Sequence, residues 1–215
     1  MKKQQVLRKL TDCGVVAVVR ADSGEEAIKI SEACVEGGIN GIEITFTVQG
    51  ADKIISELAT VYKNNSDVVI GAGTVLDAVT ARIAILAGAD FIVSPCFDKD
   101  TAELCNLYQI PYMPGCMTIT EMKDAFKSGV DIIKLFPGNT YGPDWVKGVK
   151  APLPQVNIMP TGGVDLDNVD QWIKNGCVAV GVGGSLVAHA KTGEFEKITE
   201  DARKFVDKVQ KAREA

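Results

Sequence analysis

The sequence has a single histidine and no pair of cysteines at CxxC spacing. No cluster of His, Cys and carboxylate residues has metal-ligand spacing, so we expect neither a metal nor a cofactor, and a metal-dependent reaction is disfavoured. His189 is interpreted as a surface residue. The cysteines stand mostly in apolar surroundings, and we expect reduced core thiols. They are Cys13, Cys34, Cys96, Cys105, Cys116 and Cys177.

The sequence also lacks an excess of positive charge, an abundance of aromatic residues and any long apolar run. Lys and Arg total 23 against 28 for Asp and Glu, and aromatic residues make up 6%. A nucleic acid is therefore disfavoured as the main partner, because phosphate backbones require a basic surface. No segment is apolar for long enough to be a signal peptide or a membrane span. We expect a cytoplasmic protein with no membrane partner and a small-molecule ligand.

What the sequence does contain is a repeated unit of a short apolar strand, a loop and a helical stretch. The strands are rich in Val and Ile on both faces, as buried parallel strands are. They are expected at Val15–Arg20, Gly41–Phe46, Val68–Gly73, Phe91–Pro95, Tyr112–Gly115, Ile132–Phe136, Asn157–Gly162 and Ala179–Gly183. Amphipathic helical stretches lie between them, among them Gly24–Glu36, Ala51–Tyr62, Ala78–Ala87 and Asp167–Asn175.

Eight such units in 215 residues predict an α/β fold, a (β/α)8 TIM barrel in a single domain over residues 1–215. An open doubly wound sheet is the alternative, but it does not need eight units. Lys3–Asp12 is expected to be an extra N-terminal helix that closes the bottom of the barrel, and Glu194–Arg213 the last helix. Barrels of this type carry their chemistry at the carboxyl ends of the strands and in the loops that follow.

Lys134 is the one ionisable residue within the strand Ile132–Phe136. Alternation places it on one face with Ile132 and Phe136, and this face is expected to be the barrel interior. Burial disfavours the ammonium form, and a neutral amine can attack a ketone to give an iminium, which accepts electrons when a carbon–carbon bond breaks. The alternative is a lysine that only pairs with a buried carboxylate.

Glu43 has a similar place in Gly41–Phe46, where it shares a face with Thr45 and Thr47. A carboxylate within a strand is costly unless it has a partner or a task. Beside Lys134, Glu43 could move protons during Schiff-base formation. A Glu43–Lys134 ion pair without chemistry is again the alternative, and both interpretations predict that the two residues are close.

Glycine-rich loops follow the seventh and eighth strands, which is the common phosphate site of such barrels. Their backbone N–H groups can approach an anion closely, although glycines also serve tight turns. The candidate residues are Thr161, Gly162, Gly163, Gly184 and Ser185. Arg20 ends the first strand and could bind a substrate carboxylate with two hydrogen bonds, or be an ordinary loop arginine. Thr74 and Pro95, at the ends of two further strands, could line the same pocket.

Seven motifs appear in order on successive strands. They are Ile42-Glu-Ile-Thr, Gly71-Ala-Gly-Thr-Val, Phe91-Ile-Val-Ser-Pro, Met113-Pro-Gly, Ile133-Lys-Leu-Phe-Pro, Pro160-Thr-Gly-Gly-Val and Val182-Gly-Gly-Ser. From about residue 15 to residue 187 the chain resembles the family of 2-keto-3-deoxy-6-phosphogluconate aldolases, which includes 4-hydroxy-2-oxoglutarate and 6-phosphogalactonate aldolases.

This resemblance implies a homotrimeric class I aldolase that yields pyruvate and glyceraldehyde 3-phosphate. It implies a Schiff base on Lys134 and a general acid/base at Glu43, with Thr74 and Pro95 in the pyruvate pocket. The residues expected to bind phosphate are Gly162, Gly163, Gly184 and Ser185. Further candidate substrate contacts are Thr45, Phe136 and Thr161.

One position departs from the family pattern. Many members carry an arginine that binds the pyruvate carboxylate four residues after the catalytic glutamate, where this chain has Thr47. Thr47 supplies no charge, and Arg20 is the candidate to replace it. Two rival functions stay open on the sequence: a phosphosugar isomerase or epimerase with Glu43 as the base, and a barrel that binds phosphosugars without catalysis.

Overall fold

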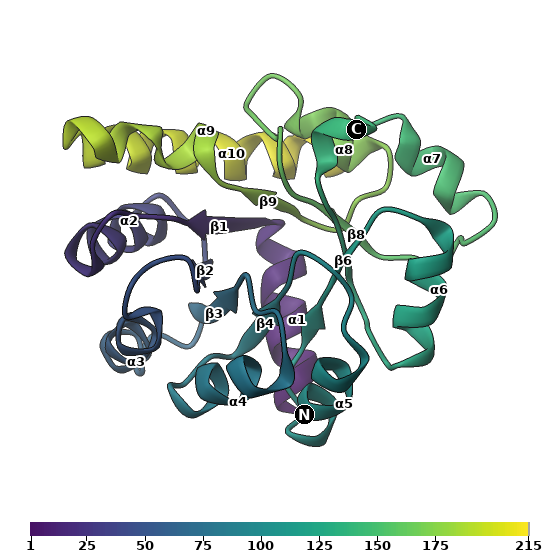
Figure 1. The fold of residues 1–215 in the computed structure, drawn as a ribbon. Helices are drawn as coiled ribbons and strands as arrows, with labels where there is room; N and C mark the ends of the chain where they lie inside the picture. The colour runs from purple at the N-terminus through teal and green to yellow at the C-terminus, as the bar shows by residue number, and fades with distance from the viewer. Residues whose placement is uncertain (215) are drawn as a thin grey trace.

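The computed structural model describes residues 1–214, and parallel strands form a ring at its centre (Figure 1). The strands are β1 (Val15–Val19), β2 (Gly41–Thr45), β3 (Val69–Gly73), β4 (Phe91–Val93), β5 (Tyr112–Met113), β6 (Gly115–Cys116), β7 (Ile133–Leu135), β8 (Ile158–Pro160) and β9 (Val180–Val182). Their order is β5-β4-β3-β2-β1-β9 in one sheet and β6-β7-β8 in the other.

Two junctions join these sheets into one barrel. β5 and β6 are parts of a single strand interrupted at Pro114, whose carbonyl accepts a hydrogen bond from the Lys134 N–H. β8 and β9 are bridged between Thr161 and Gly181. The ring therefore has eight strand positions, and the predicted (β/α)8 barrel is confirmed.

Helices surround the ring (Figure 1). They are α1 (Lys2–Cys13), α2 (Gly24–Glu36), α3 (Ala51–Val61), α4 (Ala78–Leu86), α5 (Lys99–Leu107), α6 (Ile119–Lys127), α7 (Trp145–Lys150), α8 (Val169–Lys174), α9 (Gly184–Val187) and α10 (Phe195–Glu214), with 3-10 turns at Gly138–Thr140 and Ala188–Thr192. Side chains of Ser23, Asp77, Asp98 and Thr118 accept hydrogen bonds from the first turns of α2, α4, α5 and α6, which fixes where these helices start.

All eight predicted strands are present, but most are one or two residues shorter than expected. The apolar runs continue into the loops after the ladder hydrogen bonds stop, so composition alone overestimates the strand ends. The prediction for Arg20 is thus wrong in one detail, because β1 ends at Val19 and Arg20 is an exposed loop residue.

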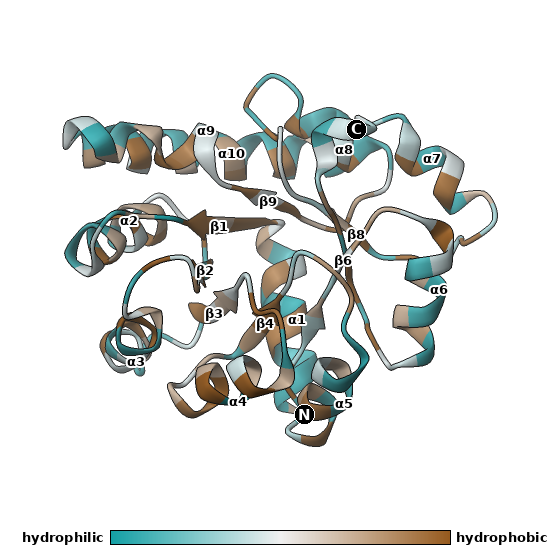
Figure 2. Cartoon of the chain, viewed as in Figure 1, coloured by the Kyte–Doolittle hydropathy of each residue, from teal (hydrophilic) through white to brown (hydrophobic). Residues whose placement is uncertain are grey.

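Alternation along the strands divides the core in two. On β1, Val15, Ala17 and Val19 pack outward against the helices, whereas Val16 packs inside the barrel. Apolar side chains from β3, β4, β5 and β8, and from the residues just before β7 and β9, join Val16, and the strands are accordingly mostly brown in Figure 2. α1 adds Val6 and Leu10 to this inner core, so it closes one end of the barrel as predicted.

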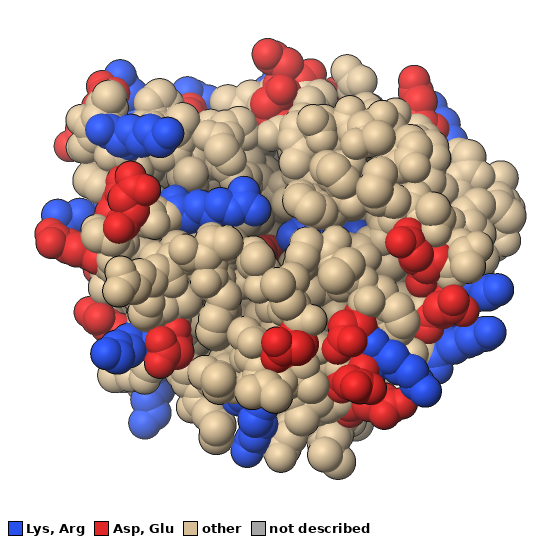
Figure 3. All heavy atoms as spheres, viewed as in Figure 1, with Lys and Arg blue, Asp and Glu red and all other residues tan. Residues whose placement is uncertain are grey.

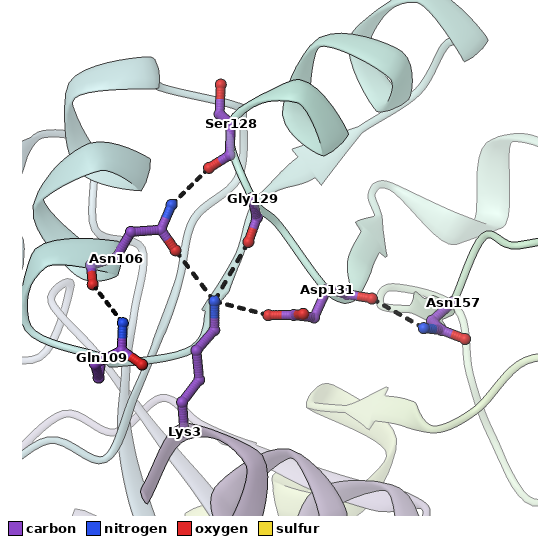
Figure 4. Close-up of polar contacts among 7 residues, drawn as sticks. All are labelled: Lys3, Asn106, Gln109, Ser128, Gly129, Asp131 and Asn157. Carbon is purple, nitrogen blue, oxygen red and sulfur yellow. Dashed lines mark hydrogen bonds and ion pairs between the residues drawn. The ribbon is translucent and has the colours of Figure 1, made fainter. Parts of the chain in front are cut away.

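Lys3 anchors α1 to the barrel through polar contacts (Figure 4). Its ammonium group donates to the Asn106 side chain (3.1 Å) and the Gly129 carbonyl (3.3 Å), and it pairs with Asp131 at 2.8 Å. The side chain is only 15% exposed. Asn106 in turn donates to Ser128, so one lysine links the turns that lead into β5 and β7.

Two expectations about the chain as a whole can be compared with the structure. Within residues 1–214, no helix combines the length and apolar character needed to cross a bilayer. Five cysteines are buried thiols, but the prediction of a core thiol is wrong for Cys96, which is exposed in the loop after β4.

We predict that Lys3→Ala lowers the free energy of unfolding by about 1–3 kcal/mol, because it removes hydrogen bonds to a charged donor and leaves their acceptors unpaired. Urea denaturation measures the change. Lys2→Ala is the matched control, since the Lys2–Asp90 pair has a lysine side chain 64% exposed and should contribute less than about 1 kcal/mol. Equal effects of the two substitutions would contradict the role given to Lys3.

Candidate active site

Lys134 projects from β7 into the barrel. Its neighbours Ile133 and Leu135 belong to the outer core, and Ile132 belongs to the inner one, so the predicted alternation is confirmed at Lys134. The lysine side chain is 3% exposed, and its Nζ lies 4.9 Å from the centroid of the Phe136 ring. Lys134 is thus an amine held within an apolar barrel, above the inner core.

Glu43 reaches the same space from β2, which lies opposite β7 in the ring. The side chain is fully buried, and its Oε1 atom is 3.9 Å from Lys134 Nζ. Its neighbour β3 makes room for the carboxylate, because a Cβ at Gly73 would overlap Glu43. Glycine within a strand marks such a close approach, and the sequence alone assigned no role to Gly73.

The environment of Glu43 favours proton exchange. Burial raises the pKa of this carboxyl, and the positive charges of Lys134 and then Arg20 oppose that effect. Neither carboxyl oxygen has a hydrogen-bond partner among the described residues. A buried carboxyl that is not engaged by the protein is free to exchange protons with a bound molecule.

A pocket of about 200 Å³ adjoins the loops after β8 and β9. Gly162 and Gly163 have φ angles of 92° and 73°, which favour glycine over other residues. The predicted residues that line this pocket are Arg20, Phe136, Thr161, Gly162, Gly163, Gly184 and Ser185. In Figure 3 a hollow opens near the middle of the face shown, with basic side chains reaching toward it.

Thr161 and Ser185 differ within this pocket. The Thr161 hydroxyl is buried and finds no hydrogen-bond partner within residues 1–214, and Gly181 leaves the space that it occupies. Ser185 donates to the Val164 carbonyl at 2.7 Å, which fixes the loop after β8 against the start of α9. Val164 and Asp165 also line the pocket and were not predicted from the sequence.

The other predicted residues, Lys134 and Glu43 included, are not among those that line this pocket. Thr45 is buried at the end of β2 and its hydroxyl is 2.7 Å from that of Thr47. Thr47 is exposed and lines a neighbouring pocket that shares Arg20 and Gly184 with the first. Thr74 follows β3 with a φ of 55°, unusual for a residue other than glycine, and Pro95 follows β4.

A (β/α)8 barrel with a buried lysine, a buried carboxyl opposite it and glycine loops at the phosphate position is the arrangement of a Schiff-base lyase. The family model for KDPG (2-keto-3-deoxy-6-phosphogluconate) and KHG (4-hydroxy-2-oxoglutarate) aldolases matches residues 6–200. The chain belongs to this aldolase family, as its motifs predicted.

Three comparisons illustrate the similarity. The chain is 33% identical to the 2-dehydro-3-deoxy-phosphogluconate aldolase of Treponema pallidum over 86% of this chain and 88% of that protein. The Legionella pneumophila KDPG aldolase, solved with pyruvate as a covalent carbinolamine, is 28% identical with a TM-score of 0.81, covering 88% and 92% of the two chains. A cage designed by fusing symmetric oligomeric domains is 27% identical with a TM-score of 0.86, covering 94% and 73%.

We predict that Glu43→Gln folds and keeps a free energy of unfolding within about 1 kcal/mol of the parent near neutral pH. Burial raises the pKa of Glu43 in the folded chain above the ordinary value of 4.5. Above pH 4.5 the unfolded parent loses this proton more readily than the folded parent does, so raising the pH lowers the free energy of unfolding of the parent. Glu43→Gln has no carboxyl to titrate at this position, so its free energy of unfolding relative to the parent should rise with pH. Urea titrations at several pH values measure this difference.

A structural ion pair predicts the opposite outcome. Removing one partner would then leave an uncompensated buried ammonium group and cost about 3–5 kcal/mol. A loss of that size would contradict the catalytic assignment of Glu43. Glu57→Gln, on the exposed side of α3, is the matched control and should change little at any pH.

Proposed function

We propose that this enzyme is a class I aldolase that cleaves 2-dehydro-3-deoxy-6-phosphogluconate to pyruvate and D-glyceraldehyde 3-phosphate through a Schiff base on Lys134. The observation that carries the proposal is the buried amine of Lys134, 3.9 Å from the buried carboxyl of Glu43, in a chain of the aldolase family. Phe136, which lies beside the Lys134 amine, also lines the pocket at the glycine loops, which supports an approach of the substrate from that side.

The reaction begins when the neutral amine of Lys134 attacks the C2 ketone. Glu43 passes a proton to the departing hydroxyl, and loss of water leaves an iminium. The C4 hydroxyl then gives its proton to a base, the C3–C4 bond breaks, and its electron pair moves into the iminium to form an enamine. Glyceraldehyde 3-phosphate leaves. Protonation of the enamine at C3 and hydrolysis of the iminium release pyruvate and restore the lysine.

The remaining substrate contacts are assigned by their positions. The glycine loops at Gly162–Gly163 and Gly184–Ser185 are suited to the phosphate, since their backbone N–H groups can approach it closely. Thr161 has a buried free hydroxyl for the sugar acid, and Phe136 packs beside the amine. Thr74 and Pro95 complete the pyruvate pocket, and Thr45 orients Thr47.

The substrate carboxylate is assigned to Arg20. This residue borders both the pocket beside Phe136 and the neighbouring one that contains Thr47. Its charge is also close enough to act on the Glu43 carboxyl. Arg20 can therefore supply, from the end of β1, the positive charge that Thr47 lacks at the end of β2.

The cleavage itself is tested with a coupled assay of pyruvate release. We predict that the parent releases pyruvate and that Glu43→Gln lowers turnover about 10²–10⁴-fold, the usual contribution of a general acid/base. The Glu57→Gln control should retain full turnover. An isomerase or a silent binding barrel would release no pyruvate at all. Comparing the galactonate epimer and unphosphorylated 4-hydroxy-2-oxoglutarate defines the preferred acid.

We predict that Arg20→Ala raises KM for the keto acid about 10- to 100-fold, because a charged hydrogen-bonded pair contributes roughly 1.5–3 kcal/mol. Arg20→Lys keeps the charge but loses the two-point geometry, so its KM should lie between those of the parent and the alanine variant. Steady-state kinetics measure KM for each variant. An unchanged KM in Arg20→Ala would contradict the assignment of the substrate carboxylate to Arg20.

A homotrimer is also proposed, and an apolar stripe on α4 supports it. Val79, Ile83 and Leu86 recur at helical spacing on the outward side, exposed Leu76 lies just before the helix, and Val79 and Leu86 are 71% and 70% exposed. The opposite side packs Ala81 and Ala84 into the core, so the predicted amphipathic helix is wrong here: both faces are apolar. α4 is accordingly mostly brown in Figure 2.

The stripe continues onto α5. Exposed Leu107 and Tyr108 lie beside it, and the one charge on α4, Arg82, stacks on the Tyr108 ring at 4.0 Å. The exposed side chains amount to several hundred Å², about the largest apolar patch of ordinary monomers. A second copy of the chain is the partner that the related symmetric oligomer favours. A cytoplasmic location fits the six free thiols.

We predict that Leu86→Glu converts the trimer to smaller species, because it would bury an unpaired charge in the interface. Light scattering coupled to size exclusion measures the mass. Ala151→Glu adds the same charge at an exposed position after α7 and should leave the trimer intact. A monomeric parent, or a Leu86→Glu variant that still forms trimers, would contradict the proposed interface.

A further inference from the structure

The loop after β4 enters the barrel mouth beside Lys134. In the strand register Gly115 of β6 is the partner of Lys134, so both positions face the interior. A Cβ at Gly115 would overlap the Pro95 carbonyl, and it would also crowd the Cys96 nitrogen. The peptide between Pro95 and Cys96 therefore occupies the space that a side chain at position 115 would otherwise fill, next to the reactive amine.

A chain of hydrogen bonds outside the barrel holds the Cys96 carbonyl, which belongs to the next peptide of the same loop. The Asp98 N–H donates to the Tyr112 hydroxyl at 3.2 Å, and the Tyr112 and Ser94 hydroxyls are 2.7 Å apart. Ser94 donates to the Cys96 carbonyl at 2.5 Å, and the Tyr112 hydroxyl is 3.3 Å from the same oxygen. Ser94 is fully buried and Tyr112 is 4% exposed, so the bond between their hydroxyls is shielded from solvent.

The Asp98 backbone N–H donates to Tyr112, and each hydroxyl has a single hydrogen to donate. In the arrangement with the shortest bond, Ser94 donates to Cys96 and Tyr112 donates to Ser94; in the other, Ser94 donates to Tyr112 and Tyr112 donates to Cys96. Both arrangements end on the Cys96 carbonyl. Burial raises the pKa of the Tyr112 phenol well above its usual value, so the phenol keeps its proton. The Tyr112 ring packs in the outer core, which a phenylalanine would preserve.

We propose that Tyr112 is a positioning residue, which acts with Ser94 to hold the Cys96 carbonyl and so to fix the adjoining Pro95–Cys96 peptide as a wall of the Lys134 pocket. The inference rests on the proposed function, because it assigns this wall to the keto acid that Lys134 attacks. Tyr112 does not touch the reacting atoms. Its hydroxyl determines where the loop stands, and misplacement by about 1 Å of a group that orients a substrate can reduce rates by ~10²-fold.

The test compares Tyr112→Phe, Ser94→Ala and the double variant with the parent enzyme. Active sites are counted first, by trapping with pyruvate and borohydride, so that kcat is expressed per competent site. We expect kcat/KM per site to fall about tenfold in each single variant. The double variant should fall by about the same factor as either single one, because both hydroxyls act on one peptide. Tyr62→Phe, on a half-buried tyrosine after α3, is the matched control and should be unchanged.

Three results would overturn the inference. Unchanged kcat and KM per site in Tyr112→Phe, even with a lower melting temperature, would make the hydroxyl merely structural. A double variant reduced by the product of the two single effects would show that the residues act independently. An effect of the same size in Tyr62→Phe would show that the loss is not local. A parent that neither traps pyruvate nor cleaves substrate is a separate outcome, which overturns the proposed function itself.

Discussion

The close approach of one lysine and one glutamate inside an apolar barrel is the interaction on which the rest of the structure depends. Both side chains are almost fully buried, and their nearest polar atoms are 3.9 Å apart. Burying two ionisable groups without further partners is costly in free energy. A role in proton transfer to and from a bound keto acid explains why both are buried here. Gly73 gives the carboxylate its space and Phe136 shields the amine, so neighbouring strands are adapted to this pair.

One end of the barrel is closed by a helix, and the other carries the candidate site. At one end α1 covers the inner core with Val6 and Leu10, and Lys3 fastens it to the turns before β5 and β7. At the other end the strands give way to loops that carry the pocket-lining residues. Parallel strands make this division possible, since all their carboxyl ends meet on one side. Loops can therefore vary in substrate contacts while the closed end preserves the fold.

The sequence was sufficient for the barrel and for the burial of Lys134 beside Glu43, because both depend on local patterns. Alternation placed Lys134 and Glu43 inside, and glycines marked the loops after β8 and β9. The strand ends, the exposure of Cys96 and the apolar outer face of α4 were not predictable, because each depends on how separate segments pack. The contact between Ser94 and Tyr112 joins residues 18 positions apart, and the gap that Gly115 leaves for Pro95 appears only when the strand register is known.

The most direct test of the account is to incubate the protein with pyruvate, reduce it with borohydride and map the modified lysine by peptide mass spectrometry. The account predicts a stable pyruvate adduct on Lys134, because this lysine is buried 3.9 Å from the Glu43 carboxyl and beside Phe136, which lines the pocket at the substrate loops. Pyruvate binding without any adduct, or an adduct on another lysine alone, would contradict a Schiff base at this position.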